Sequence, residues 1–173
     1  MHVKPTLRYS GLPAHNACCE AHAAAPGEVL DKIEALCRIR GLRLTSQRRA
    51  VLAALLEAKK PLGAYDLMDS LRGENGRSPA PIAVYRALDF LKENGFIHRL
   101  ETLNAFIACP HHHASGERIV FLICEACRHV EEAVAIPLNN ALIALAHDRD
   151  FTVKRQVVEL AGICRNCTEN RAS

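Results

Sequence analysis

Two Cys-x-x-Cys motifs constrain this chain more than any other feature. Cys124 and Cys127 form the first, Cys164 and Cys167 form the second, and 36 residues separate them. Two residues between the thiolates let both sulfur atoms reach one tetrahedral ion at about 2.3 Å. A redox pair or free buried thiols are the alternatives, but a second motif of the same spacing favours zinc over both. The four thiolates therefore predict a closed, structural zinc site.

The composition indicates a globular protein that is not exported. The chain has 173 residues, of which 49% are hydrophobic, enough for one or two domains. Its longest obvious apolar run, residues 50–56, is far shorter than the about 18 residues that a membrane span needs. Lys4 and Arg8 precede no continuous apolar stretch, so no secretory signal is expected. We expect a cytoplasmic protein with no membrane partner, whose eight cysteines are metal ligands more than disulfides.

The first half of the chain has the element order of a winged helix-turn-helix. Residues 1–27 contain several helix breakers and predict a mobile tail, whose Cys and His residues lack a preorganised frame for a metal. Thr45 is the predicted N-cap of the second helix, and Gly95 the cap that ends the fourth. The predicted elements are helices 28–41, 47–58, 64–72 and 82–93, then a hairpin of 96–101 with 105–108.

Helix 82–93 would be the recognition helix of such a fold and would lie in a major groove. Helices followed by a hairpin also occur in folds that bind nothing, so this pattern alone leaves DNA binding open. Five arginines fall within twelve residues beside the second helix, and they are either a solvated face or phosphate contacts. These arginines are Arg38, Arg40, Arg43, Arg48 and Arg49.

The second half of the chain predicts a small α/β unit. Its predicted elements are strands 119–124, 129–136 and 151–160, and a helix over 138–147. Three strands and one helix make a thin core, so we expect the chain to form a homodimer that covers the sheet.

A second group of possible metal ligands surrounds the junction of the two halves. It contains an imidazole in the hairpin, a thiol at the end of the hairpin, a run of three histidines and two acidic residues. They are His98, Cys109, His111, His112, His113, Glu131 and Glu132. A mixed Cys/His/Glu set suits Zn²⁺ better than Mn²⁺ or Fe²⁺. Because this site would span both halves, it predicts a regulatory metal that fixes the angle between them.

Five motifs, in this order and spacing, resemble the ferric uptake regulator family, and within it the regulators of zinc uptake. The resemblance runs from about residue 28 to 168 and excludes the N-terminal 27 residues. The motifs are Leu44-Thr45-x-Gln47-Arg48, Val84-Tyr85-Arg86-Ala87-Leu88-x-x-Leu91, Gly95-Phe96-Ile97-His98, Phe121-x-Ile123-Cys124-x-x-Cys127 and Gly162-x-Cys164-x-x-Cys167.

This resemblance implies an α+β fold, in which an N-terminal winged helix-turn-helix DNA-binding domain is joined by a hinge to a small α/β dimerisation domain. It implies a zinc-responsive repressor that binds palindromic, AT-rich operator DNA as a dimer and controls zinc-uptake genes. Such a protein is not an enzyme and has no small-molecule substrate. The domains implied are a tail over 1–27, the winged domain over 28–108, a hinge and metal-binding loop over 109–117, and the dimerisation domain over 118–173.

The resemblance also implies the site residues. Two zinc ions per chain are expected, a structural one in the four-Cys site and a regulatory one at His98, Cys109, Glu132 and a loop histidine. His113 is the predicted loop ligand, with His111 the alternative. Arg155 stands where other members often have a histidine, and because arginine cannot ligate a cation we expect no third site. The residues expected on DNA are Tyr85, Arg86, Arg43, Arg48 and Arg49.

Three other functions compete with this interpretation. An iron-sensing or peroxide-sensing relative would more often use oxygen and nitrogen donors without a thiolate such as Cys109. A zinc hydrolase could use Glu131 as its base, but it needs an open coordination position that a full ligand set would fill. A zinc-ribbon module would bind another protein and no DNA.

Overall fold

The computed structural model describes residues 25–73, 76–109, 119–153 and 156–170 of the chain. The predicted tail falls almost entirely outside these ranges, as do His111, His113 and Arg155. Within the described residues, no helix combines the length and the apolar character that crossing a membrane requires.

Four helices form the N-terminal half, each beginning and ending within two residues of its predicted bounds. They are α1 (Pro26–Ile39), α2 (Ser46–Ala58), α3 (Ala64–Ser70) and α4 (Pro81–Glu93). The Thr45 hydroxyl accepts a hydrogen bond from the Arg48 N–H at 3.4 Å, which confirms the predicted N-cap of α2. Gly95 has φ +73°, a left-handed conformation that glycine adopts without strain, and it ends α4 as predicted.

The apolar stripes of these helices meet in one core. Ile33 of α1, Leu52 of α2, Leu67 of α3 and Leu91 of α4 are all fully buried in it. Cys37 is also buried there as a core residue, and burial raises the pKa of its thiol.

A hairpin of β1 (Ile97–Leu100) and β2 (Ala105–Ala108) follows α4, as predicted. Leu62 extends it, because the backbones of Leu62 and Phe106 exchange two hydrogen bonds of 2.8 and 2.9 Å. Every residue of β2 is buried, although a hairpin at the edge of a domain would expose one face. Phe106 and Ala108 pack on the helical core, and Ile107 packs in the opposite direction.

The C-terminal half is a three-stranded sheet in the order β4-β3-β5. Its strands are β3 (Ile119–Cys124), β4 (Val130–Val134) and β5 (Val158–Gly162). β3 pairs antiparallel with β4 and parallel with β5, and α5 (Ile136–His147) belongs to the crossover between β4 and β5.

One expectation for this half was wrong, and one element was missed. The strand predicted over 151–160 begins only at Val158, and Phe151 and Val153 instead line an apolar pocket beside α5. A short helix, α6 (Arg165–Glu169), was not predicted; it begins directly after Cys164, inside the second Cys-x-x-Cys motif.

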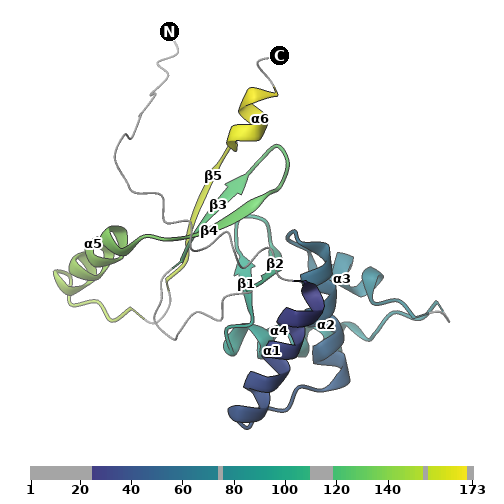
Figure 1. Ribbon diagram of the computed structural model, residues 1–173. Coiled ribbons are helices and arrows are strands. Elements are labelled where there is room, and N and C mark those ends of the chain that lie inside the picture. The colour runs from purple at the N-terminus through teal and green to yellow at the C-terminus, as the bar shows by residue number, and fades with distance from the viewer. Residues whose placement is uncertain (1–24, 74–75, 110–118, 154–155, 171–173) are drawn as a thin grey trace.

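A second, smaller core joins the hairpin to the sheet. It consists of five buried residues, one set from β1 and β2 and the other from β3 and β4: Leu100, Ile107, Phe121, Ile123 and Val130. Figure 1 shows the hairpin between the helices on one side and the three-stranded sheet on the other. The hairpin is thus the element through which the two halves touch.

Candidate metal centres and DNA-facing helix

The parallel pairing of β3 with β5 brings the two Cys-x-x-Cys motifs together. Cys124 is the last residue of β3 and lies opposite Gly162, the last residue of β5. The second motif therefore starts two residues beyond the same end of these two strands. The four sulfur atoms, those of Cys124, Cys127, Cys164 and Cys167, lie within 4.8 Å of one another. All cysteines among the described residues are free thiols, which confirms that these four form no disulfide here.

The spacing of these thiols fits a zinc ion. The Sγ atoms of Cys127 and Cys164 are 3.8 Å apart, and a tetrahedron with bonds of about 2.3 Å has edges of about 3.8 Å. Backbone N–H groups, first that of Cys127 and then that of Cys164, lower the pKa of Cys124 to about 6. Neighbouring thiols, Cys127 first, raise the pKa of Cys167 to about 12. A divalent cation is what would let all four sulfurs ionise together.

A second candidate centre lies between the hairpin and the sheet. His98 comes from β1, Cys109 directly follows β2, and Glu132 comes from β4; one ligand atom of each lies within 4.8 Å of the other two. The N–H of Cys109 donates to the carbonyl of Phe96 at 2.9 Å, which fixes the backbone after β2. Three residues predicted as regulatory ligands are therefore brought together from both halves of the chain.

Burial makes these three donors a suitable metal site. Cys109 is fully buried, and Glu132, with 3% of its surface exposed, is the buried charged residue of the described chain. The distance from His98 Nε2 to Glu132 Oε1 is 3.9 Å, against about 3.4 Å for two such donors on one tetrahedral zinc. The His98 ring also contacts Phe121, with the ring centroids 5.1 Å apart. A buried carboxylate beside a buried thiol is costly without a compensating cation, so the donor set fits Zn²⁺.

The fourth predicted ligand, His113, and its alternative His111 lie outside the described residues. The centre described here consequently has three protein donors from residues 25–109 and 119–170. His129 and His147 are exposed and belong to neither candidate centre.

Helix α4 presents two of the predicted DNA contacts to solvent. Tyr85 is 45% exposed and Arg86 is also exposed, while Val84, Ala87 and Leu88 hold the opposite side of the helix in the core. A large aromatic ring left in water on a helix that is otherwise well packed is typical of a binding surface. Tyr85 and Arg86 thus lie on the outer face of α4, and their contact with DNA stays a prediction.

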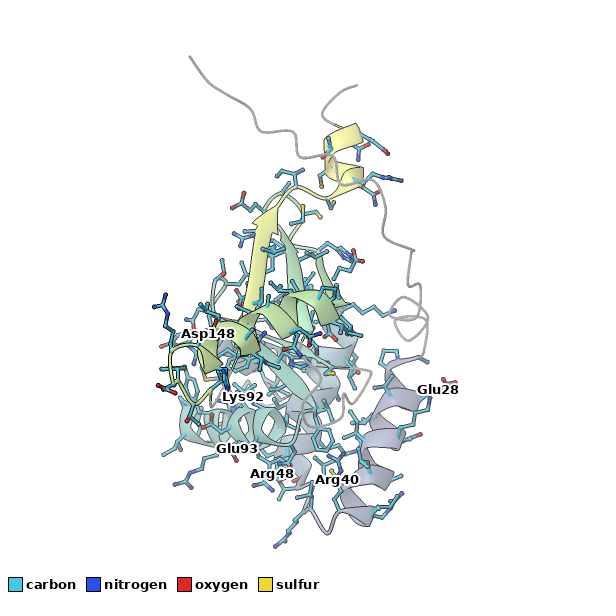
Figure 2. All side chains as sticks on the ribbon, turned by 90° about the vertical axis from the view of Figure 1, so that its left-hand side faces the viewer. Glu28, Arg40, Arg48, Lys92, Glu93 and Asp148 are labelled. Atoms are coloured by element: carbon cyan, nitrogen blue, oxygen red, sulfur yellow. The ribbon has the colours of Figure 1, made fainter. Side chains whose placement is uncertain are left out.

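The arginines near α2 have intramolecular partners. The guanidinium of Arg48 lies 3.6 Å from the centre of the Phe90 ring and donates to the Arg43 carbonyl at 2.6 Å. Arg49 forms an ion pair with Glu34 of α1. Figure 2 places Arg48 and Arg40 at the lower end of the molecule, on its helical half. The predicted contacts of Arg43, Arg48 and Arg49 with DNA stay predictions.

One contact between the halves has no counterpart in the sequence analysis. The Glu159 carboxylate, on β5, accepts hydrogen bonds from the N–H of Glu101 at 2.6 Å and from that of Thr102 at 2.9 Å. Burial opposes ionisation of Glu159, but the Thr102 hydroxyl and these two N–H groups outweigh it and lower the pKa of the carboxyl. No motif signals such a pairing, because its donors are backbone groups.

Comparison with known proteins decides the family. Residues 39–161 match the sequence model of the ferric uptake regulator family. The zinc uptake regulation protein of Escherichia coli strain K12 is 35% identical over 145 residues, which cover 84% of each chain. The chain belongs to the ferric uptake regulator family. The peroxide operon regulator of Bacillus subtilis strain 168 is more distant, at 27% identity over 84% of this chain and 97% of that protein.

Solved structures agree with this family and with its zinc branch. A zinc uptake regulator complexed with zinc and DNA has a TM-score of 0.81 and 34% identity, over 87% of this chain and 99% of the other. The structure of holo XcZur has a TM-score of 0.76 and 40% identity, over 84% and 99%. The predicted fold class, a winged-helix domain followed by a small α/β dimerisation domain, is thereby confirmed.

Proposed function

We propose that this member of the ferric uptake regulator family is a cytoplasmic, zinc-responsive transcriptional repressor. It binds palindromic, AT-rich operator DNA as a homodimer when regulatory zinc is bound, and it controls zinc-uptake genes. Two zinc ions per chain are proposed. Cys124, Cys127, Cys164 and Cys167 hold the structural one, and His98, Cys109, Glu132 and His113 hold the regulatory one.

The placement of His98, Cys109 and Glu132 carries this proposal. His98 belongs to the wing hairpin, Cys109 directly follows it, and Glu132 belongs to the sheet. A ligand common to all three therefore favours one arrangement of the two halves. Zinc would place one positive charge beside both the buried Glu132 and the buried Cys109. A ligand shifts a population only by binding one arrangement better, and a site divided between two domains meets this condition.

We propose the domain boundaries of a tail over 1–27, a winged domain over 28–108, a hinge loop over 109–117 and a dimerisation domain over 118–173. The apolar surface of the proposed dimerisation domain supports a dimer. No residue of α5 is buried, and Ile143, Leu145 and Phe151 are each about half exposed or more. β5 is an edge strand of the described sheet. Figure 1 shows α5 standing clear of the sheet, and a second chain would cover both.

Two alternatives are less well supported. A zinc hydrolase needs a coordination position for water, whereas three described donors and one loop histidine would fill a tetrahedral site. An iron or peroxide sensor would more often lack a thiolate like that of Cys109, and the peroxide operon regulator of Bacillus subtilis is less similar to this chain than the zinc uptake regulation protein is. We therefore propose neither an enzyme nor a sensor of these other signals.

The first expected result is a steep dependence of DNA binding on free zinc. Protein whose four-Cys site is already loaded would be titrated with buffered free Zn²⁺ against an AT-rich palindromic duplex, with binding read by fluorescence anisotropy. We expect affinity to rise at least about tenfold over a narrow range of zinc, and not with Fe²⁺ or Mn²⁺. Binding that is indifferent to zinc, or absent in all conditions, would overturn the proposed function.

Arg86→Ala is expected to weaken operator binding about 10- to 100-fold, since one bidentate contact with a base is worth about 1–3 kcal/mol. The zinc concentration at the midpoint of the response should not move, because Arg86 lies on α4, away from the proposed ligands. Lys32→Ala is the matched control, as it removes an exposed positive charge from α1. An Arg86→Ala protein that bound the operator like wild type would exclude this residue from the DNA contact.

A further inference from the structure

The wing hairpin is held to the sheet at two separate points. At one, His98 and Cys109 converge with Glu132. At the other, the two N–H groups of residues 101 and 102, in the turn of the hairpin, donate to the carboxylate of Glu159. The buried residues Leu100, Ile107 and Phe121 lie in the apolar contact of the hairpin with the sheet.

The strand register places the two carboxylates in one row. Phe121 of β3 lies opposite Glu132 of β4 on one side and opposite Glu159 of β5 on the other. Residues that pair across adjacent strands point to the same face of a sheet, with strands about 4.8 Å apart. Glu132 and Glu159 therefore flank Phe121 on the face that meets the wing, one reaching the proposed metal centre and the other the turn.

The turn that Glu159 holds is itself well fixed. Asn104 adopts a left-handed conformation with φ +46°, and its N–H donates to the carbonyl of Glu101 at 3.2 Å. Its side-chain oxygen accepts from the Arg99 guanidinium, also at 3.2 Å. A carboxylate that accepts hydrogen bonds from two N–H groups of such a turn therefore positions the whole hairpin, including His98 on β1. Since the donors are backbone groups, the grip does not depend on the side chain at position 101.

We propose that Glu159 is a positioning residue that clasps the wing to the dimerisation sheet, and so sets the zinc concentration at which the protein responds. This inference rests on the proposed function. This contact favours the arrangement in which His98, Cys109 and Glu132 converge. A smaller part of the free energy of zinc binding is then needed to order the wing. The apparent affinity for zinc is the intrinsic affinity multiplied by the fraction of molecules in the competent arrangement. The contact made by Glu159 keeps this fraction high. Glu159 itself binds no metal and touches no DNA.

The test compares Glu159→Gln with Glu28→Gln. Glutamine keeps the size of the side chain but offers one oxygen acceptor in place of two, and its NH₂ group faces an N–H donor. Glu28 is an exposed glutamate of α1 that belongs to neither candidate metal centre. Amide hydrogen exchange at residues 101 and 102 and the zinc dependence of operator binding are measured for both variants, with the four-Cys zinc confirmed by metal analysis.

For Glu159→Gln we expect exchange at these two amides to quicken about tenfold, and the zinc midpoint to rise about tenfold, the scale of one charge-assisted hydrogen bond. Operator affinity at saturating zinc should stay within about twofold, since excess zinc restores the arrangement. Glu28→Gln should match wild type in both measurements. Thr102→Val, which replaces only the hydroxyl with a methyl group, should shift both in the same direction by less, and it stands in if Glu159→Gln fails to fold.

Unchanged exchange in Glu159→Gln would overturn the clasp, and faster exchange with an unchanged zinc midpoint would overturn its role in the response. An equal loss of operator affinity at every zinc concentration would also overturn it, because a merely structural role predicts that result. If wild-type protein binds DNA without regard to zinc, the proposed function fails, while the exchange measurement still decides whether Glu159 holds the wing.

Discussion

Replacing Cys109 with serine is expected to abolish the zinc response and to leave a folded protein that retains one zinc ion per chain. Serine has nearly the size of cysteine but is a poor zinc ligand, and Cys109 is fully buried beside His98 and Glu132. Even changes outside the ligands cost about 10- to 100-fold in metal affinity, so loss of a ligand should cost at least about 100-fold. Operator binding in buffered zinc measures the loss of the response, and mass spectrometry counts the zinc ions that remain bound.

Cys37→Ala is the matched control for Cys109→Ser. Cys37 is also a fully buried cysteine, but it lies in the helical core and in neither candidate centre. Its removal should lower the thermal midpoint modestly, through a small cavity, and leave the zinc midpoint in place. If Cys109→Ser responded to zinc like wild type, or lost both zinc ions, the assignment of Cys109 to a separate regulatory site would be wrong.

The sequence predicted best those features that local spacing determines. The 3.6-residue period of α1 to α4 and the capping residues Thr45 and Gly95 located the helices to within two residues. The same holds for the four thiols, since a Cys-x-x-Cys motif positions its sulfurs by itself and only the pairing of the two motifs depends on the sheet. Local geometry and the family resemblance together were sufficient for this part of the molecule.

Features set by contacts across the fold were harder to predict. The apolar alternation over 151–157 resembled a strand, but Phe151 and Val153 face the pocket beside α5, so their pattern reflects a surface and not the sheet. The five residues of α6 are too few to nucleate a helix by themselves, and they follow Cys164 within the second motif. Glu159 contacts residues 101 and 102, which lie 58 and 57 positions before it in the chain. The donors are backbone N–H groups, which leave no trace in a sequence.

The two cores explain why the structural zinc site should matter most for stability. The helical core gathers buried residues from four helices and the hairpin, whereas the core at the sheet has only five. Occupied structural zinc sites contribute on the order of 10 kcal/mol of folding free energy, as much as the whole stability of a typical domain. We therefore expect the sheet to depend on the proposed zinc for its stability, and the helices to depend on it much less.

Cys164→Ser is accordingly expected to unfold the C-terminal half and to destroy dimer formation, while α1 to α4 stay folded. Cys164 is a suitable position because it caps α6 and its N–H donates to Cys124 Sγ at 3.3 Å; serine keeps that N–H and removes only the ligand. Zinc content, circular dichroism and sedimentation would be compared with those of Cys109→Ser, which removes a thiol from the other centre. We expect the helical signal to remain while the dimer and both zinc ions are lost. The regulatory zinc is lost too because its proposed ligand Glu132 belongs to the same sheet. A Cys164→Ser protein that remained dimeric with an unchanged thermal midpoint would show that the four thiols do not hold the fold together.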